Sequence, residues 1–594
     1  MVYKLTFTAG LRRGVRAMSA ERVRELRYEP EETPPPALAL GLGSQFAMLT
    51  VAGIVLTPAI VVRAAGAGED FLSWAAFAAL AISGITTILQ AVRVGRIGSG
   101  HVLLMGTSAA FIAVCVTALA EGGPGLLATL VTLSALFQFG LSTKLSLLRR
   151  VLTPTVCGTV IMLIPVTLMP IMFGMLDDVP EGSSPGAAPV SVIVTLLVTV
   201  AVTLRATGYW RLWAPVIGIA SGCVAAAYYG LYDARLVADS EWVGLPAGAW
   251  PGFDLNFGVA FWSLLPAFVF VTLIGAIETI GDSVAIQRVS RRKPRATDFR
   301  VVQGAVAADG VGNLLSGLAA TVPNTTYSSS VSVTDITGVA ARAVGVAIGA
   351  VFIVLAFLPK FMSLILAIPG PVVGAYTIVL MSTLFVLGMR VVVEDGTDYR
   401  KGIVAGVGFW IGLGFQNELL FADALGAWSG LLSNGMTSGG LAAILMTLFL
   451  EWSRPRPLRL QTDLNTAAYP KIDKFLAQFA SSRGWDEAMT DRLRAVGEET
   501  LITLIRPSDE GEAATERRLR ISARNDGRAA ELEFIAATDK SNIEDRIAVL
   551  GDRVTGARAE QEVSLRLLRH LASSVRHQQY HETDVVTVRV ESPD

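Results

Sequence analysis

Charged residues are scarce in this chain: Lys, Arg, Asp and Glu make up 17% of its 594 residues, whereas 52% are hydrophobic. A water-soluble protein carries roughly 25% charged residues, so most soluble classes are excluded. The apolar residues fall in blocks of about 17 to 25 with almost no internal charge, which is the length that crosses a hydrocarbon core as a helix. The composition therefore indicates a polytopic membrane protein.

Cysteine is also rare, and Cys115, Cys157 and Cys223 lie in or beside apolar segments without the paired spacing of a metal site. We therefore expect structural thiols. A cleavable signal peptide is not expected either. Residues 1–36 are basic, then acidic and proline-rich, and they contain no apolar core segment.

The few charges are unevenly distributed, so the net charge of −1 averages two unlike regions. Between residues 37 and 452 the charges are sparse and lie between apolar blocks, whereas residues 453–594 are dense in Arg, Glu and Asp. We predict a cytoplasmic N-terminal segment (1–36), a membrane domain (37–452) and a cytoplasmic α/β domain (453–594), which we call the tail domain.

Fourteen apolar segments of the membrane domain can be read as spans of an all-α bundle. They are 37–62, 71–91, 102–119, 125–142, 151–175, 189–205, 211–232, 259–287, 302–319, 328–340, 342–358, 371–389, 402–415 and 433–451. Basic clusters such as Arg93 with Arg96 and the RRKPR run at 291–295 follow even-numbered segments, whereas the acidic pair Asp177-Asp178 follows an odd one. The positive-inside rule then places both termini in the cytoplasm, with the chain in the inner (plasma) membrane.

Two segments are too polar at their start to face lipid. The third contains Gly106-Thr107-Ser108, and the tenth begins with the run Pro323–Ser330. They are the third members of two seven-span halves, and paired interrupted segments point to a transporter site. Because seven is odd, the halves must be inverted, and both half-helix N-termini would point at one midplane site.

Three carboxylates sit inside apolar segments. Glu278 and Asp282 are four residues apart on one face of the eighth segment, and Asp309 lies in the ninth. A charge at mid-bilayer costs roughly 2.5 to 3.5 kcal/mol by insertion scales. A substrate and proton site is one interpretation, and helix–helix contact through buried hydrogen bonds is the other.

The motifs in these segments resemble those of the nucleobase–ascorbate transporter family, the xanthine and uracil permeases, over residues 37–452. One position of these motifs differs: Phe46 stands where the family usually has His. The matching stretches are Gly43-Ser44-Gln45-Phe46, Gly106-Thr107-Ser108-Ala109-Ala110-Phe111, Glu278-Thr279-Ile280-Gly281-Asp282, Ala308-Asp309-Gly310 and Leu432-Ser433-Asn434-Gly435-Met436.

The resemblance implies two inverted seven-span repeats, a core domain that rocks against a gate domain, and a homodimer. Glu278 would accept hydrogen bonds from a base, with Phe111 or Tyr327 near the face of the ring. Ser108, Ser329 and Ser330 would complete the binding site at the half-helix starts. Asp282, Asp309 and Gln45 would support coupling or helix packing.

One departure concerns the tenth-segment signature, which begins with Gln or Glu in the family and reads Ser329-Ser330-Val331-Ser332 here, followed by Thr337-Gly338. Serine is shorter and cannot hold a base edge with two hydrogen bonds. A water could fill the gap, the substrate could be bulkier, or it could be a non-standard base; a decayed site is the remaining alternative.

The tail domain resembles, in the order of its elements, the ATP-binding domain of anti-sigma-factor serine kinases. Helices are predicted at 471–483, 486–506 and 560–576, and strands at 517–524, 531–537 and 584–590. The family's metal-holding Asn is replaced by Ile502, four residues after Glu498, and residues 538–542 lack the nucleotide-binding glycines. We therefore expect a degenerate ATPase-like domain.

The sequence thus predicts a transporter and not an enzyme. We expect symport of a nucleobase-like solute with a proton, leaving sodium open, and no cofactor, no metal and no nucleic-acid partner. A membrane-embedded sensor whose tail signals to a cytoplasmic regulatory partner is the alternative. A sulfate-permease-like anion transporter is a further alternative, although Glu278 would repel an anion at low dielectric.

Overall fold

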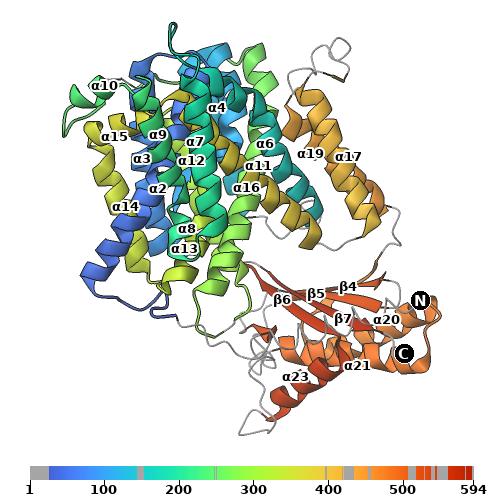
Figure 1. The fold of residues 1–594 in the computed structure, drawn as a ribbon. Coiled ribbons are helices and arrows are strands. Elements are labelled where there is room, and N and C mark those ends of the chain that lie inside the picture. The colour runs from blue at the N-terminus through green and yellow to red at the C-terminus, as the bar shows by residue number, and fades with distance from the viewer. Residues whose placement is uncertain are drawn as a thin grey trace, which may run out of the picture.

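A helical bundle and a smaller unit built on a β-sheet make up the computed structural model (Figure 1). The structure describes residues 26–591 except 144–152, 247, 249, 294, 395–397, 418, 421–431, 433, 453–456, 506–516, 527–528, 537–541, 545–558 and 582. The predictions that concern residues 1–25, Ser433 and most of the 538–542 loop therefore lie outside the described residues.

The long helices pack as two groups. The first group, which we call the core bundle, consists of α2 (Pro36–Ala64), α3 (Glu69–Val92), α4 (Ile112–Thr143), α11 (Val259–Val289), α12 (Phe299–Leu318), α13 (Ser329–Thr337) and α14 (Arg342–Ala356). The second, the gate bundle, consists of α6 (Pro154–Gly174), α7 (Ala187–Arg205), α9 (Ala214–Tyr228), α16 (Gly370–Glu394), α17 (Tyr399–Gln416) and α19 (Gly435–Trp452).

Short elements connect these helices. They are β1 (Met105–Thr107), η1 (Ala109–Phe111), η2 (Met175–Asp177), α8 (Tyr209–Leu212), α10 (Ala234–Ala238), β2 (Asn324–Thr326) and α15 (Pro359–Leu366).

Helices occur in all fourteen segments predicted to span, but they differ in length. Among the described residues, seven helices are long and apolar enough to cross a membrane alone, and α14 with α15, bent by 87°, would make an eighth. The structure thus supports a multi-pass, mostly helical membrane protein, and the count of fourteen and the inverted repeat stay predictions.

Helix boundaries follow local chemistry. The third and fourth predicted segments run on as one helix, α4, interrupted at Gly123, whose φ of 69° lies in the left-handed region that glycine tolerates. Pro124 follows directly and removes a backbone donor. The side chains of Thr153 and Asp298 accept hydrogen bonds from the backbones of Val156 and Arg300 and so begin α6 and α12.

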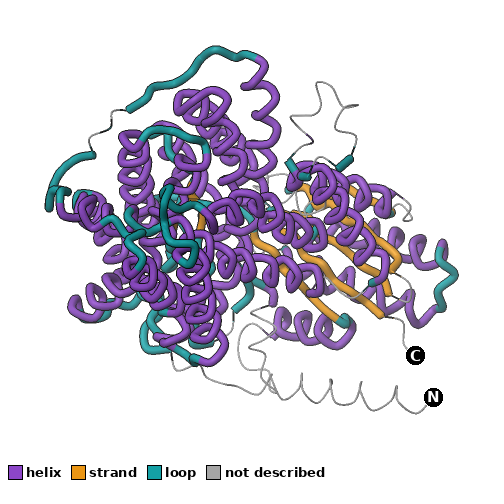
Figure 2. The backbone as a smooth tube through the Cα atoms, turned by 45° about the horizontal axis from the view of Figure 1, so that its top comes forward, coloured by secondary structure: helices purple, strands orange, loops and turns teal. Residues whose placement is uncertain are grey.

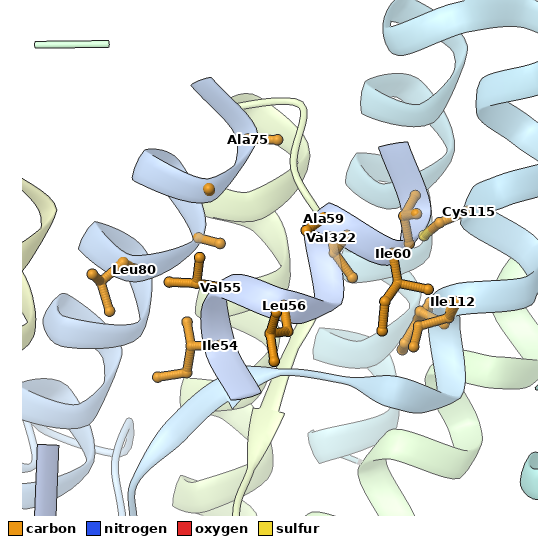
Figure 3. Close-up of a cluster of buried hydrophobic side chains, with 14 of the residues drawn as sticks. Ile54, Val55, Leu56, Ala59, Ile60, Ala75, Leu80, Ile112, Cys115 and Val322 are labelled. Atoms are coloured by element: carbon orange, nitrogen blue, oxygen red, sulfur yellow. The ribbon is translucent and has the colours of Figure 1, made fainter. Parts of the chain in front are cut away.

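The core bundle is closely packed around α2. Figure 3 shows Ile54, Leu56 and Ile60 of α2 lying between residues of α3, α4 and the β2 connection, such as Leu80 and Ile112. Glycines allow the closest approaches between helices. A Cβ on Gly84 of α3 would lie 2.6 Å from the carbonyl oxygen of Gly349 in α14, and one on Gly158 of α6 would lie 2.5 Å from that of Gly388 in α16.

Residues 26–35 form an N-terminal strap across the ends of α11, α13 and α14. Tyr28 pairs with Val339 as an isolated β-bridge, and Arg27 donates its backbone N–H to the oxygen of Gly338 at 2.7 Å. Arg292, in the loop after α11, donates to both carboxylate oxygens of Glu32 at 2.6 and 2.7 Å. The strap is thus fixed to the core bundle by backbone pairing and by ion pairs.

The tail domain has its own hydrophobic core, built on one face of a five-stranded antiparallel sheet of order β3-β4-β5-β7-β6. Figure 2 shows these strands as one layer, and in Figure 1 α21 and α23 cover the face that points away from the helical bundle. The elements are β3 (Leu458–Asp463), α20 (Tyr469–Ser482), α21 (Glu487–Leu504), β4 (Arg518–Asp526), β5 (Ala529–Ala536), α23 (Ala559–Leu571), β6 (Ser574–Gln579) and β7 (Asp584–Glu591).

Most predicted elements of the tail occur, but two strands were missed. The helix predicted at 560–576 was wrong at its end, because α23 stops at Leu571 and β6 begins at Ser574. Apolar residues continue from α23 into β6, so the hydrophobic pattern does not show where the helix ends and the strand begins. The first strand, β3, alternates weakly and lies at the sheet edge, where one side is exposed.

Candidate functional site

The site begins where the two polar segment starts meet in the core bundle. β1 and β2 pair antiparallel, with Met105 opposite Thr326 and Thr107 opposite Asn324. The backbone N–H of Ser108 donates to the oxygen of Pro323 at 2.8 Å, which extends the pairing. Non-helical backbone inside a membrane needs such internal partners, and this strand pair supplies them. The helical turns of η1 and α13 start directly after it, so both N-terminal ends lie together.

Helix α11 passes beside this strand pair and brings two of the three carboxylates to it. Asp282 accepts hydrogen bonds from the hydroxyls of Thr326 at 2.8 Å and Ser328 at 2.6 Å, and its side chain is buried. The carboxylate therefore links α11 to the start of α13. Coupling or support, the role that the resemblance implies for Asp282, stays a prediction.

Asp309 of α12 is the centre of a second buried network. One of its oxygens accepts hydrogen bonds from the Gln138 amide at 2.7 Å and the Thr279 hydroxyl at 2.9 Å. The network continues because Asn313 donates to Gln138 at 2.6 Å and accepts from the backbone N–H of Asn324 at 2.7 Å. It joins α4, α11, α12 and β2, and so it fixes the helices around the strand pair.

Glu278 differs from both aspartates. It lies one helical turn before Asp282, and no hydrogen bond holds its carboxylate within the described part of the chain. Its side chain instead lines a cavity of ≈ 810 Å³. A half-buried carboxylate that faces open space is available to a ligand, whereas Asp282 and Asp309 are already engaged.

The cavity lies between the two bundles. The core bundle and its connections contribute residues of α2, β1, η1, α11, β2 and α13, and the gate bundle and its connections contribute residues of α6, α7, α8, α9 and α16. Leu204, Arg211 and Arg390 lie at or near the ends of α7, α8 and α16, so the cavity reaches the ends of these helices. Polar and aromatic lining residues include Thr50, Thr107, Glu278, Thr325, Tyr327, Ser328, Ser329 and Tyr376.

The predicted site residues divide into two sets. Glu278, Tyr327 and Ser329 line the cavity. Phe111 and Ser108 do not line it: both are buried, and Phe111 packs against Phe268 with ring centroids 6.3 Å apart. The remaining predicted residues also lie outside the lining, and they are Ser330, Gln45, Asp282 and Asp309.

Several of these residues act structurally. The hydroxyl of Ser330 donates to the oxygen of Tyr327 at 2.6 Å and accepts from the backbone N–H of Leu104 at 2.9 Å, which ties α13 to β1. Tyr327 donates its hydroxyl to the oxygen of Thr107 at 3.1 Å, with its ring against Gly106. The ring of Tyr327 is therefore held across the strand pair at the cavity wall.

Sequence reasoning missed the contribution of the gate bundle. Tyr376, Arg211 and Arg390 line the cavity. Of these, only Tyr376 could have been singled out from the sequence, because it is an isolated tyrosine in the otherwise apolar segment 371–389. Sequence reasoning also missed Gln138, which donates to Asp309, and Asn313, which donates to Gln138. Among the described residues no group of three His, Cys, Asp or Glu side chains could hold a metal ion.

Together these groups suit a small, flat, polar solute. Glu278 offers an acceptor to N–H groups, the half-helix starts present backbone N–H groups and positive dipole ends, and two tyrosines flank the space. The contact between two separate bundles allows the cavity to change its opening if one bundle moves against the other.

Comparisons with known proteins identify the family of this chain. Residues 38–421 match the model of the Permease family of xanthine and uracil permeases. The chain is 28% identical over 442 residues to the xanthine permease XanP of Escherichia coli, covering 71% of this chain and 94% of that protein. It is 25% identical over 423 residues to the nucleobase transporter PlUacP of Paenibacillus larvae, covering 70% and 95% of the two chains.

Solved structures of other transporters are more distant. The transmembrane domain of the cyanobacterial bicarbonate transporter BicA aligns with a TM-score of 0.42 at 16% identity, over 71% of this chain and all 100% of that one. Murine Slc26a9, an anion transporter, aligns with a TM-score of 0.46 at 14% identity, over 77% and 78% of the two chains. The family match covers the core bundle and most of the gate bundle, over residues 38–421, and this chain therefore belongs to the Permease family of xanthine and uracil permeases.

Proposed function

We propose that this protein is a secondary transporter that carries a nucleobase-like solute, a purine or pyrimidine, together with a proton. The core bundle would rock against the gate bundle around the cavity, so that Glu278 faces one side of the membrane and then the other. The homodimer, the cytoplasmic position of both termini and the plasma membrane as location belong to the same proposal. Sodium is the alternative coupling ion.

One observation carries the proposal: the Glu278 carboxylate reaches an otherwise mostly apolar cavity between the bundles, beside two aspartates that are already hydrogen-bonded. This chain covers most of the length of relatives that are named as a xanthine permease and a nucleobase transporter. These names support the proposed solute class. The proposal does not specify which substituents the base carries, because Ser329 at the start of α13 offers only a short hydroxyl to the cavity.

Proton coupling would follow if the solute binds well only when a buried carboxyl is protonated. Coupling of this kind requires a difference in affinity between the two protonation states. Glu278 is the group best placed to create that difference, since the solute and the proton would occupy the same carboxylate.

The test is uptake of labelled xanthine, uracil, substituted purines and ascorbate into proteoliposomes, with an imposed pH gradient or sodium gradient. We expect Glu278→Gln to abolish uptake of the transported base, because the neutral amide both loses the proton site and presents N–H donors to the base. Glu121→Gln, an exposed carboxylate in α4, is the matched control and should transport normally. Normal uptake by correctly inserted Glu278→Gln protein would overturn the assignment.

The sensor alternative is favoured by the contact that the tail domain makes with α11 and α12. A sensor would bind xanthine in equilibrium dialysis without net uptake under any imposed gradient. A sulfate-permease-like anion transporter would respond to a sulfate gradient instead, and the Glu278 carboxylate argues against it by charge repulsion.

A further inference from the structure

The tail domain touches the core bundle through the turn between β6 and β7. The backbone N–H of Tyr580 donates to the oxygen of Thr583 at 3.0 Å, which closes this turn. The ring of Tyr580 packs on the ring of Phe299 at the start of α12, with centroids 5.2 Å apart. Val302 is 0% exposed and Tyr580 6% exposed, so the contact excludes water.

The apolar contact extends to α11. Ile280 and Val284 pack against the same cluster as Tyr580, Val585 and Val302. Ile280 lies on the turn of α11 between Glu278 and Asp282. The tail therefore contacts the same short stretch of helix that carries the proposed solute site.

A polar contact completes the interface. The backbone N–H of His581 donates to the Oε1 of Gln303 at 2.9 Å, and the Nε2 of Gln303 donates to the oxygen of Ser142 at 3.1 Å. Gln303 is 7% exposed, so its amide needs both partners. Burial, with the guanidinium groups of Arg96, Arg93 and Arg300 nearby, lowers the pKa of His581.

The tail is also tied to the gate bundle, but covalently. Its first strand, β3, starts at Leu458, only six positions after α19 ends at Trp452. One rigid sheet is thus joined to the gate bundle by the chain and to the core bundle by the Tyr580 contact. A displacement between the bundles must be taken up either by that connection or by the contact.

We propose that the β6–β7 turn is a clip, formed by Tyr580, His581 and Val585 on Phe299, Val302 and Gln303, that restrains the core bundle against the gate bundle and thereby slows transport. The inference rests on the proposed function. Anything that detaches the tail would then raise transport, and by linkage a solute that moves the core bundle would loosen the tail. A merely stabilising contact has neither consequence.

Cross-linking tests the clip in the full-length chain. In protein with Cys115, Cys157 and Cys223 replaced by serine, Phe299→Cys and Tyr580→Cys are joined by a short bifunctional maleimide. We expect fully cross-linked protein to take up labelled xanthine at least ~5-fold more slowly than the same protein before linking. The control pair is Ser522→Cys with Glu533→Cys, neighbours across β4 and β5, whose cross-link leaves the clip free.

The converse variant is Tyr580→Ala, which removes the buried ring and should raise uptake by about 2- to 5-fold at unchanged membrane content. Ile502→Ala, a partly exposed apolar residue of α21, is its matched control. Equal uptake by cross-linked and unlinked protein would overturn the clip. Absence of uptake by the unlinked protein would instead contradict the proposed function; in that case the clip is tested by the rate of cross-linking, which must rise or fall when xanthine is bound.

Discussion

The position of the Tyr327 ring yields a prediction that tests the geometry of the strand pair directly. Gly106 in β1 has no side chain, and a Cβ built there would collide with the Cζ and hydroxyl of Tyr327. The three nearest atoms to that Cβ all belong to Tyr327. In Gly106→Ala protein the ring must therefore leave its place on β1 and lose its hydrogen bond to the oxygen of Thr107.

The magnitude follows from the cost of overpacking. Forcing a buried side chain from its place costs about 1–3 kcal/mol, which corresponds to ~5- to 150-fold in an equilibrium constant. Gly106→Ala should therefore weaken xanthine binding within that range and lower the melting temperature. In a Tyr327→Ala background the same change should cost less than ~0.5 kcal/mol, because the atoms that it strikes are gone.

The assay is a double-mutant cycle on purified protein in detergent. Four proteins are compared by xanthine binding and by thermal unfolding: the unaltered protein, each single variant and the double variant. A coupling energy above ~1 kcal/mol supports the contact. Additive effects, or a Gly106→Ala variant that binds and melts like the unaltered protein, would show that Tyr327 does not lie across β1.

Two further predictions concern other parts of the chain. Gly158→Leu should destabilise the gate bundle by about 1–3 kcal/mol, because the added carbons meet the oxygen of Gly388, and it should lower the melting temperature without depending on xanthine. The Glu32–Arg292 hydrogen bonds lower the pKa of Glu32 from 4.5 to about 2, so their contribution is present above the ordinary value and is lost as pH falls through 4.5 toward 2. The protection factors of the backbone amides in residues 26–35, taken against the intrinsic exchange rate at each pH, should then fall over that window, less so in Glu32→Gln protein; unchanged protection factors would show that the strap is held by its backbone pairing alone.

The sequence was sufficient to predict helices in the apolar segments and to identify the three carboxylates within them. Long apolar segments predict helices because a membrane helix must satisfy its backbone internally, and the polar starts of two segments stood out against that rule. Glu278 was identified because a charged side chain inside an apolar segment is costly in a membrane, and its side chain lines the cavity.

The parts that could not be predicted depend on contacts across the chain. A three-residue strand such as β1 is too short to show an alternation of apolar and polar residues in the sequence. Its partner strand also lies more than 200 positions away. The roles of Gln138 and Asn313 could not be predicted from their own segments, because Gln138 reaches Asp309 from another helix, α4, and Asn313 of α12 in turn holds Gln138. Phe111 was expected at the ring of the solute because its segment matched, yet the helical turn directs it to Phe268 instead.

The pairing of β1 with β2 has a consequence for synthesis and insertion. Met105–Thr107 leaves the ribosome long before Asn324–Thr326 exists, so its backbone N–H and C=O groups have no strand partner during that interval. Exposing them to lipid would cost several kcal/mol per group. Residues 105–107 must therefore stay in water, or bound to the insertion machinery, until α11, α12 and β2 have been synthesised. The centre of the finished site thus cannot be assembled until β2 has been synthesised.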